Sequence, residues 1–181
     1  MKSRGVFINL CTINIVNYLI LVDYVVFMEI NYFKLIVSIV ACLLVGFIAG
    51  IWTASSISSW YNSLNKPSFN PPNWLFGPVW TMLYILMGIS LYLVWNSNGS
   101  KTAIMFFVIQ LVLNFLWSFM FFSLKNPLVA FVDIIILLVM IILTTIQFYP
   151  VSRTATGLMI PYILWVSFAS VLNFSIYWLN R

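Results

Sequence analysis

Hydrophobic residues gather along this chain in five long runs, separated by shorter polar segments. Each run holds about 20 residues, the length that a helix needs to cross the hydrocarbon core of a bilayer. Each run is bounded by a charge, a proline or a polar cluster. The runs cover residues 35–56, 74–95, 102–124, 128–149 and 157–179. This pattern predicts an all-α fold, an integral membrane bundle of five transmembrane helices.

The segments between the runs predict how the helices connect. Three of the four are short, so we expect helices that follow one another to pack against each other in antiparallel pairs. The first connection, residues 58–73, is long and carries Pro67, Pro71 and Pro72. These prolines rule out a regular helix there, because each lacks an amide donor and restricts the residue before it.

Residues 1–33 are interpreted as an N-terminal extension. Residues 6–22 are apolar but include three asparagines, which makes them marginal as a sixth span. The bases ahead of them resemble the start of a signal peptide, yet no small-residue cleavage site follows. We favour a peripheral helix, or a true start at Met28, over a sixth crossing, and a leader remains as an alternative. The membrane domain is then expected to cover residues 34–181.

Composition supports a membrane protein and removes several classes of chemistry. Of the 181 residues, 64% are hydrophobic and 6% are charged, and the mean hydropathy is +1.08, whereas soluble domains are about 25% charged. The net charge of +5 comes from bases scattered between the runs, as is typical of helix ends. The chain has no histidine, and Cys11 and Cys42 lie in separate runs. We therefore expect no catalytic residue, no metal site, no required cofactor and no nucleic-acid partner.

Polar and aromatic residues inside the runs are the main sign of a function, because an unpaired polar group is costly in a membrane. Three runs carry a stripe of them at helical spacing: Trp80, Tyr84 and Gly88; Gln110, Asn114 and Trp117; and Tyr162, Trp165, Ala169 and Asn173. These groups either bond to one another between helices or line a cavity. Amides beside large flat rings favour a pocket for a planar amphipathic ligand.

Two further features of the runs leave alternatives open. Asp133 is the only acid inside a run, and we expect it to reach the membrane interface or a loop amide. Gly46, Gly50 and Ala54 form a ladder of small residues, which lets another helix approach closely. The ladder suits a contact within the bundle or across a dimer, and the contact within the bundle is slightly preferred.

Five motifs along residues 34–181 resemble those of the TspO/MBR family, the tryptophan-rich sensory proteins related to the mitochondrial translocator protein. The motifs follow in the family's order: Trp60-Tyr61-x-x-Leu64-x-Lys66-Pro67 with Pro71-Pro72; Gly77-Pro78-Val79-Trp80-x-x-Leu83-Tyr84; Gln110-Leu111-x-Leu113-Asn114-x-x-Trp117; Asp133; and Pro161-Tyr162-x-x-Trp165-x-x-Phe168-Ala169-x-x-Leu172-Asn173.

The resemblance implies a five-helix bundle, often a homodimer, whose first loop closes a pocket for porphyrins, haem and aromatic drug-like ligands. In eukaryotic relatives it also implies a cholesterol site near the end of the fifth helix. The ligand-binding residues expected from the motifs and stripes are Trp80, Tyr84, Asn114, Trp117, Tyr162, Trp165, Ala169 and Asn173. The expected lid residues are Trp60, Lys66, Pro67, Phe69, Pro71 and Pro72.

Two positions depart from the family pattern. Phe69 stands where relatives often have a tryptophan, and some relatives are proposed to degrade porphyrin photochemically with that tryptophan and the one that matches Trp165. Phe174 stands where the cholesterol motif has a tyrosine. We therefore expect a receptor or sensor for tetrapyrroles, or for similar aromatic or sterol-like ligands, in a bacterial-type cell membrane, with a regulatory or transport role. An enzyme that degrades bound porphyrin in light, and a tetrapyrrole or sterol transporter, remain as alternatives.

Overall fold

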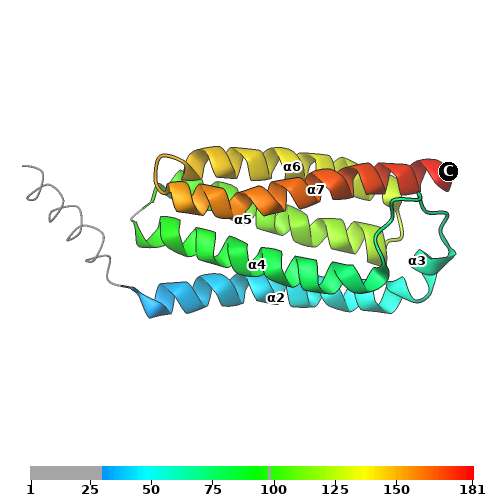
Figure 1. Cartoon of the computed structure of the whole chain (residues 1–181), viewed down its shortest axis with the longest axis horizontal. Helices are drawn as coiled ribbons and strands as arrows, with labels where there is room; N and C mark the ends of the chain where they lie inside the picture. The colour runs from blue at the N-terminus through cyan, green and yellow to red at the C-terminus, as the bar shows by residue number, and fades with distance from the viewer. Residues whose placement is uncertain (1–29, 98) are drawn as a thin grey trace, which may run out of the picture. The chain divides into compact units, whose positions relative to one another are not determined.

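The computed structural model describes residues 30–97 and 99–181, and Tyr32–Arg181 form one compact unit. Its long helices lie side by side (Figure 1): α2 (Tyr32–Ile57), α4 (Asn73–Asn96), α5 (Lys101–Ser118), α6 (Pro127–Phe148) and α7 (Arg153–Leu179). A π-helical turn, η1 (Phe119–Ser123), extends α5. In this part of the chain, five helical segments are long and apolar enough to cross a membrane, which confirms the predicted all-α membrane fold.

The helices form a closed ring in which α2 packs on α4, α4 on α7, α7 on α6, α6 on α5 and α5 on α2. The connection between α4 and α5 is short, yet α4 packs chiefly on α2 and α7, and α5 packs chiefly on α6. A short connection therefore does not make α4 and α5 a closely packed pair. Of the predicted extension, residues 1–29 lie outside the described part of the chain.

Side-chain caps set the start of three helices, because the first amides of a helix have no partner within it. The Ser100 hydroxyl accepts from the Thr102 amide at 3.2 Å, and the Asn126 side chain accepts from the Val129 amide at 3.2 Å. The Ser152 hydroxyl accepts from the Ala155 amide at 3.2 Å. This last cap explains why α7 begins at Arg153, four residues before the apolar run that predicted it.

The first connection departs slightly from its prediction. A short helix, α3 (Trp60–Ser63), forms ahead of the prolines, and the chain from residue 64 to residue 72 is free of regular helix. The amide of Asn70 donates to the Pro67 carbonyl at 3.0 Å, which closes a turn. Helix α4 then begins directly after Pro72. The prolines exclude a helix only where they stand, so four residues before them remain free to form one.

Glycines allow α2 and α4 to approach closely. A Cβ atom at Gly88 would lie 2.6 Å from the Cα atom of Ile39, and a Cβ atom at Gly46 would fall on the ring of Tyr84. Both contacts join α4 to α2 within one chain. The preferred contact within the bundle is therefore confirmed for Gly46, whereas Gly50 has no atom within 4 Å of such a Cβ.

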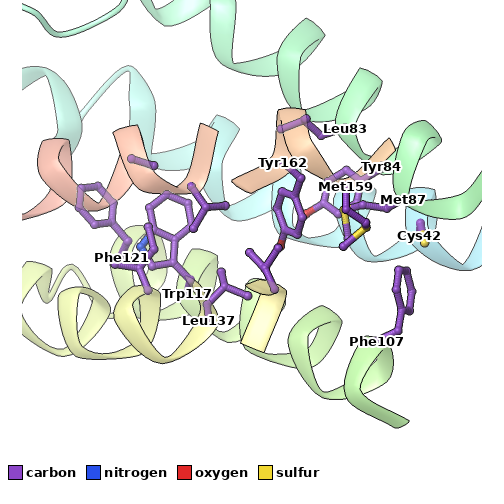
Figure 2. Packing of buried hydrophobic residues seen from close by; sticks show 14 of the residues in the cluster. Cys42, Leu83, Tyr84, Met87, Phe107, Trp117, Phe121, Leu137, Met159 and Tyr162 are labelled. Carbon is purple, nitrogen blue, oxygen red and sulfur yellow. The ribbon is translucent and has the colours of Figure 1, made fainter. Parts of the chain in front are cut away.

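The end of α5 is wound more widely than the sequence predicted. In η1, Phe121 and Phe122 are both buried, so two consecutive rings turn inward. Ser56 on α2 donates its hydroxyl to the Phe122 carbonyl at 2.7 Å. Figure 2 shows Phe121 next to Trp117 in the interior of the bundle. The π-helical turn thus brings additional aromatic surface to the centre of the ring of helices.

Candidate ligand-binding site

A cavity of about 490 Å³ lies between α2, α4 and the end of α5 with η1. We call it the large cavity. Its walls are mostly apolar, with small residues on α2 and aromatic rings on the other side. Its lining residues are Leu43, Gly46, Phe47, Ala49, Gly50, Thr53, Ala54, Ile57, Asn73, Phe76, Gly77, Trp80, Thr81, Tyr84, Trp117, Ser118 and Phe122. Pockets for small molecules typically measure about 300–1,000 Å³, so this space is large enough for a ligand.

A second, small cavity of about 20 Å³ lies deeper in the ring, between α4, α5, α7 and the first connection. Its lining residues are Tyr61, Phe76, Trp80, Trp117, Phe121, Phe122, Trp165, Ala169, Leu172, Asn173 and Ile176. Side chains nearly fill it. The two cavities share four lining residues, which we call the aromatic wall: Phe76, Trp80, Trp117 and Phe122.

The aromatic wall is held in place by ring contacts and by one hydrogen bond. The Trp80 and Trp117 rings lie 6.1 Å apart with 31° between their planes, and Trp80 also lies 5.7 Å from Tyr84. The Trp117 indole donates to the Asn173 side-chain oxygen at 3.0 Å. Asn173 in turn donates to the Pro127 carbonyl at 2.7 Å. The indole that faces the large cavity is therefore fixed through three helices.

A buried polar chain supports the cavity from the side. Tyr84 donates its hydroxyl to the Asn114 side-chain oxygen, and the Asn114 amide donates to the Tyr162 hydroxyl at 3.0 Å. Figure 2 shows Tyr84 and Tyr162 close together in the core. Of the three, only Tyr84 lines the large cavity. Asn114 and Tyr162 line neither of the two cavities. Their hydrogen bonds instead hold Tyr84 in position.

Three predicted polar positions keep buried atoms without a hydrogen-bond partner among the described residues. These atoms are both ends of the Gln110 amide, Oδ2 of Asp133 and the indole nitrogen of Trp165. Asp133 is 6% exposed, so other parts of the bundle cover it, and its Oδ2 makes no bond to a loop amide. Trp165 lines the small cavity with its ring, and its indole nitrogen is buried.

The first connection covers one end of the ring through aromatic contacts. Tyr61 is 2% exposed and donates its hydroxyl to Asn70 at 2.6 Å, while the Lys66 ammonium lies 4.9 Å from the Tyr61 ring centre. Burial raises the pKa of Tyr61 to about 12, against a smaller lowering by the Asn70 hydrogen bond. The Phe69 ring lies 6.2 Å from Phe168. None of the six named lid residues lines the large cavity, and Tyr61, which belongs to the same predicted segment but was not named among them, lines the small one.

Asn180 latches this connection to the end of α7. Its side-chain oxygen accepts from the Asn65 backbone amide at 2.9 Å, and its side-chain amide donates to the Asn65 carbonyl at 2.9 Å. The side chain of Asn65 itself makes only a 3.5 Å contact with the Leu179 carbonyl. Figure 1 shows α3 and the end of α7 at the same end of the bundle. The Asn180 side chain thus satisfies both the backbone N–H and the backbone C=O of Asn65.

We expect Asn180→Ala to loosen the first connection, because it removes both hydrogen bonds to the Asn65 backbone. Limited proteolysis between residues 64 and 73 is expected to become several-fold faster in detergent, while the melting temperature of the helices changes little. Asn65→Ala is the matched control, since it keeps the backbone bonds to Asn180. Equal cleavage of the wild type and Asn180→Ala would show that the latch does not hold the connection.

Sequence reasoning missed the side of the site that α2 supplies. The small residues of α2 were interpreted as a helix contact, yet Gly50, Thr53 and Ala54 line the large cavity. Gly77 and Thr81 on α4 were likewise not predicted. The available signal was the combination of small residues on two successive helices. Small residues lead to close packing or to open space, and only the structure distinguishes these outcomes.

Comparison with known proteins agrees with this architecture. The sequence profile of the TspO/MBR family matches residues 38–179. The tryptophan-rich protein TspO of Archaeoglobus fulgidus is 51% identical over 153 residues, which cover 83% of this chain and 99% of the relative. The protein of the same name from Chlorobaculum tepidum is 48% identical over 143 residues, covering 77% and 90% of the two chains. The human translocator protein is 37% identical over 123 residues, covering 65% and 73%.

The matched region includes α2 from residue 38, the other four long helices, the aromatic wall and the first connection. The relatives are matched over most of their own length, so the similarity concerns the whole bundle rather than one motif. The chain is a multi-pass integral membrane protein, and it belongs to the TspO/MBR family.

Proposed function

We propose that this protein is a membrane receptor for a planar amphipathic ligand of the tetrapyrrole class, which binds in the large cavity against the aromatic wall. The observation that carries the proposal is the 490 Å³ cavity with Trp80 and Trp117 on its inner side. Flat rings bind well to flat rings, through apolar area and offset stacking. A ligand of this shape would contact the parts of the two indoles that line the cavity.

The names of the relatives support a role in sensing or translocation. One relative from Cereibacter sphaeroides is called a tryptophan-rich sensory protein, and the human, bovine and sheep relatives are called translocator proteins. The first name refers to sensing and the second to translocation. They support the general role of the family, and the cavity supports the class of ligand proposed for this chain.

The side chains around the large cavity suit a metal-free porphyrin at least as well as haem. Its lining includes no histidine, methionine or cysteine, and the one tyrosine, Tyr84, already donates its hydroxyl to Asn114. Iron would therefore gain no strong axial ligand from these residues. Binding would rest on the porphyrin ring, with polar edges near Asn73, Thr53 and Ser118.

A ligand titration tests this proposal. Protoporphyrin, haem and a sterol are each added to the purified protein in detergent, and tryptophan fluorescence is followed. We expect saturable quenching by protoporphyrin, with haem bound no more tightly. A sterol lacks a flat conjugated ring and is expected to compete weakly. Linear, unsaturable quenching by protoporphyrin would refute the proposal.

A second experiment separates a receptor from an enzyme that consumes porphyrin in light. The Phe69 ring contacts Phe168, and Phe168 lies 5.7 Å from Trp165, so position 69 connects to that indole through one phenyl ring. A phenyl group is much harder to oxidise than an indole. We therefore expect slow loss of the porphyrin absorbance band under illumination.

Phe69→Trp is expected to speed this loss several-fold while leaving porphyrin affinity within about threefold, because both rings offer a flat face. Phe69→Leu, which removes the ring, serves as the control. Fast conversion by the wild type that persists in Trp165→Phe would favour the enzyme over the receptor.

A further inference from the structure

We propose that the large cavity opens sideways into the bilayer between α2 and α4, and that this cleft is the route by which the ligand enters. The inference rests on the proposed function and specifies it further. It restricts the ligand to amphiphiles that dissolve in the membrane, and it separates the entrance from the first connection.

The contact between α2 and α4 is closed over one part of its length and open over another. At Gly88 the Ile39 backbone leaves no room for a Cβ atom, and at Gly46 the Tyr84 ring fills the space. At Gly50 and Gly77, by contrast, a Cβ atom would meet nothing within 4 Å. Two of these glycines therefore close the seam and two leave it open.

The open part of the seam faces outward, whereas the back of the cavity is buried. Gly50 and Ala54 on α2, and Gly77 and Thr81 on α4, are exposed. All four line the large cavity, together with the buried Trp117. The cavity is thus continuous from an exposed rim to an enclosed aromatic wall. Because α2 and α4 are membrane-spanning helices, a rim on their outer side faces lipid.

The position of the rim along the helices places it close to one surface of the bilayer. Gly50 lies seven residues before the end of α2 at Ile57, and Gly77 lies four residues after the start of α4 at Asn73. At about 1.5 Å per residue, these offsets are about 10 Å and 6 Å from the helix ends. Both ends lie where α3 lies (Figure 1). The cleft therefore runs from near the headgroups into the hydrocarbon.

The polar atoms of the cleft suit an amphiphile that keeps one edge near the headgroups. Asn73 is exposed at the start of α4, and its amide donates to the Asn62 side chain at 3.2 Å. Deeper in the cleft, Thr53 and Thr81 donate their hydroxyls to carbonyls of their own helices, at 3.1 and 2.9 Å. The deeper walls thus offer few free donors. A porphyrin would enter with its ring toward the aromatic wall and its carboxylates toward the surface.

The test is to fill the cleft from Gly50 and to measure binding rates. Gly50→Ala, Gly50→Leu and Gly50→Phe are reconstituted in nanodiscs that hold one chain each, and protoporphyrin is delivered from lipid vesicles. Stopped-flow quenching of tryptophan fluorescence gives the association and dissociation rates. Gly157→Phe is the matched control, because Gly157 is an exposed helical glycine whose Cβ would also meet nothing within 4 Å.

We expect association to slow in the order Ala, Leu, Phe, by tenfold or more for Phe, with dissociation slowed in parallel and the control unchanged. If the Phe variant does not bind at all, the Ala and Leu variants decide. Unchanged association across the series would overturn the proposal, as would a loss of affinity with the association rate preserved. Unchanged rates are also the result expected if a lipid chain, and not the ligand, occupies the cleft.

The two proposals fail in different ways. If wild-type protein in nanodiscs does not bind protoporphyrin saturably, the proposed function fails. If the wild type binds and the Gly50 series associates as fast as the wild type, only the side entrance fails. A faster association in Asn180→Ala, which loosens the first connection, would place the entrance there and would also overturn the proposal.

Discussion

Replacing Gly88 by alanine is expected to destabilise the bundle by about 1–3 kcal/mol, and replacing it by leucine is expected to prevent stable folding. The added Cβ atom would lie 2.6 Å from the Cα atom and 3.1 Å from the backbone nitrogen of Ile39. Backbone atoms cannot rotate away as a side chain can. The clash is therefore relieved only if α2 and α4 separate, which loosens the main contact of α2.

Unfolding in mixed micelles with increasing denaturing detergent measures this effect through far-ultraviolet circular dichroism. Gly157→Ala is the control, since its Cβ meets nothing and alanine favours helix by about 0.5–1 kcal/mol over glycine. We expect Gly157→Ala to unfold at the same or a slightly higher detergent fraction. A Gly88→Ala protein as stable as Gly157→Ala would contradict the close packing of α2 on α4.

The membrane helices were predictable because their cause is local. A run of about 20 apolar residues is a physical requirement for crossing a bilayer, and each run is visible without knowledge of its neighbours. The predicted helices differ from the observed ones only at their ends, where local interactions set the first and last residues. Ser152 caps α7 and starts it at Arg153, and α5 passes into η1 at Phe119. Neither a cap nor a π-helical turn changes the hydrophobic pattern.

The polar stripes predicted part of the site, because residues on one helical face must meet a neighbouring helix. Trp80 on α4 and Trp117 on α5 do meet, and Trp117 bonds to Asn173 on α7, although neither pair of helices is adjacent in the ring. The stripes did not show which of these residues would face open space. Asn114 bonds to both Tyr84 and Tyr162 and lines neither cavity, and that pairing depends on the order of helices in the ring.

The large cavity was not predictable from the stripes alone, because α2 contributes to it through small residues that leave space open. Gly46 and Gly50 belong to the same ladder and both line the large cavity, yet Gly46 packs against Tyr84 whereas a Cβ atom at Gly50 would meet nothing within 4 Å. Their sequence contexts do not separate these roles. The difference arises from where the bulk of α4 lies, which is a property of the assembled bundle.

Trp80→Leu is expected to weaken protoporphyrin binding by about 1–3 kcal/mol, roughly 5- to 150-fold in the dissociation constant. Trp80 borders both cavities and contacts Trp117 and Tyr84, so it is the central ring of the aromatic wall. Leucine keeps apolar bulk in the core but removes the flat face. The variant therefore tests recognition of a planar ring more than it tests packing.

Trp178→Leu is the matched control, because Trp178 is 52% exposed near the end of α7, stacked on Arg181, and lines neither cavity. The decisive measurement is a titration of the wild type and both variants with protoporphyrin in detergent, followed by the shift of the porphyrin absorbance band. Our account predicts saturable binding by the wild type and by Trp178→Leu, and a dissociation constant raised at least fivefold in Trp80→Leu. Equal affinity in all three proteins, each shown to be folded by circular dichroism, would contradict it.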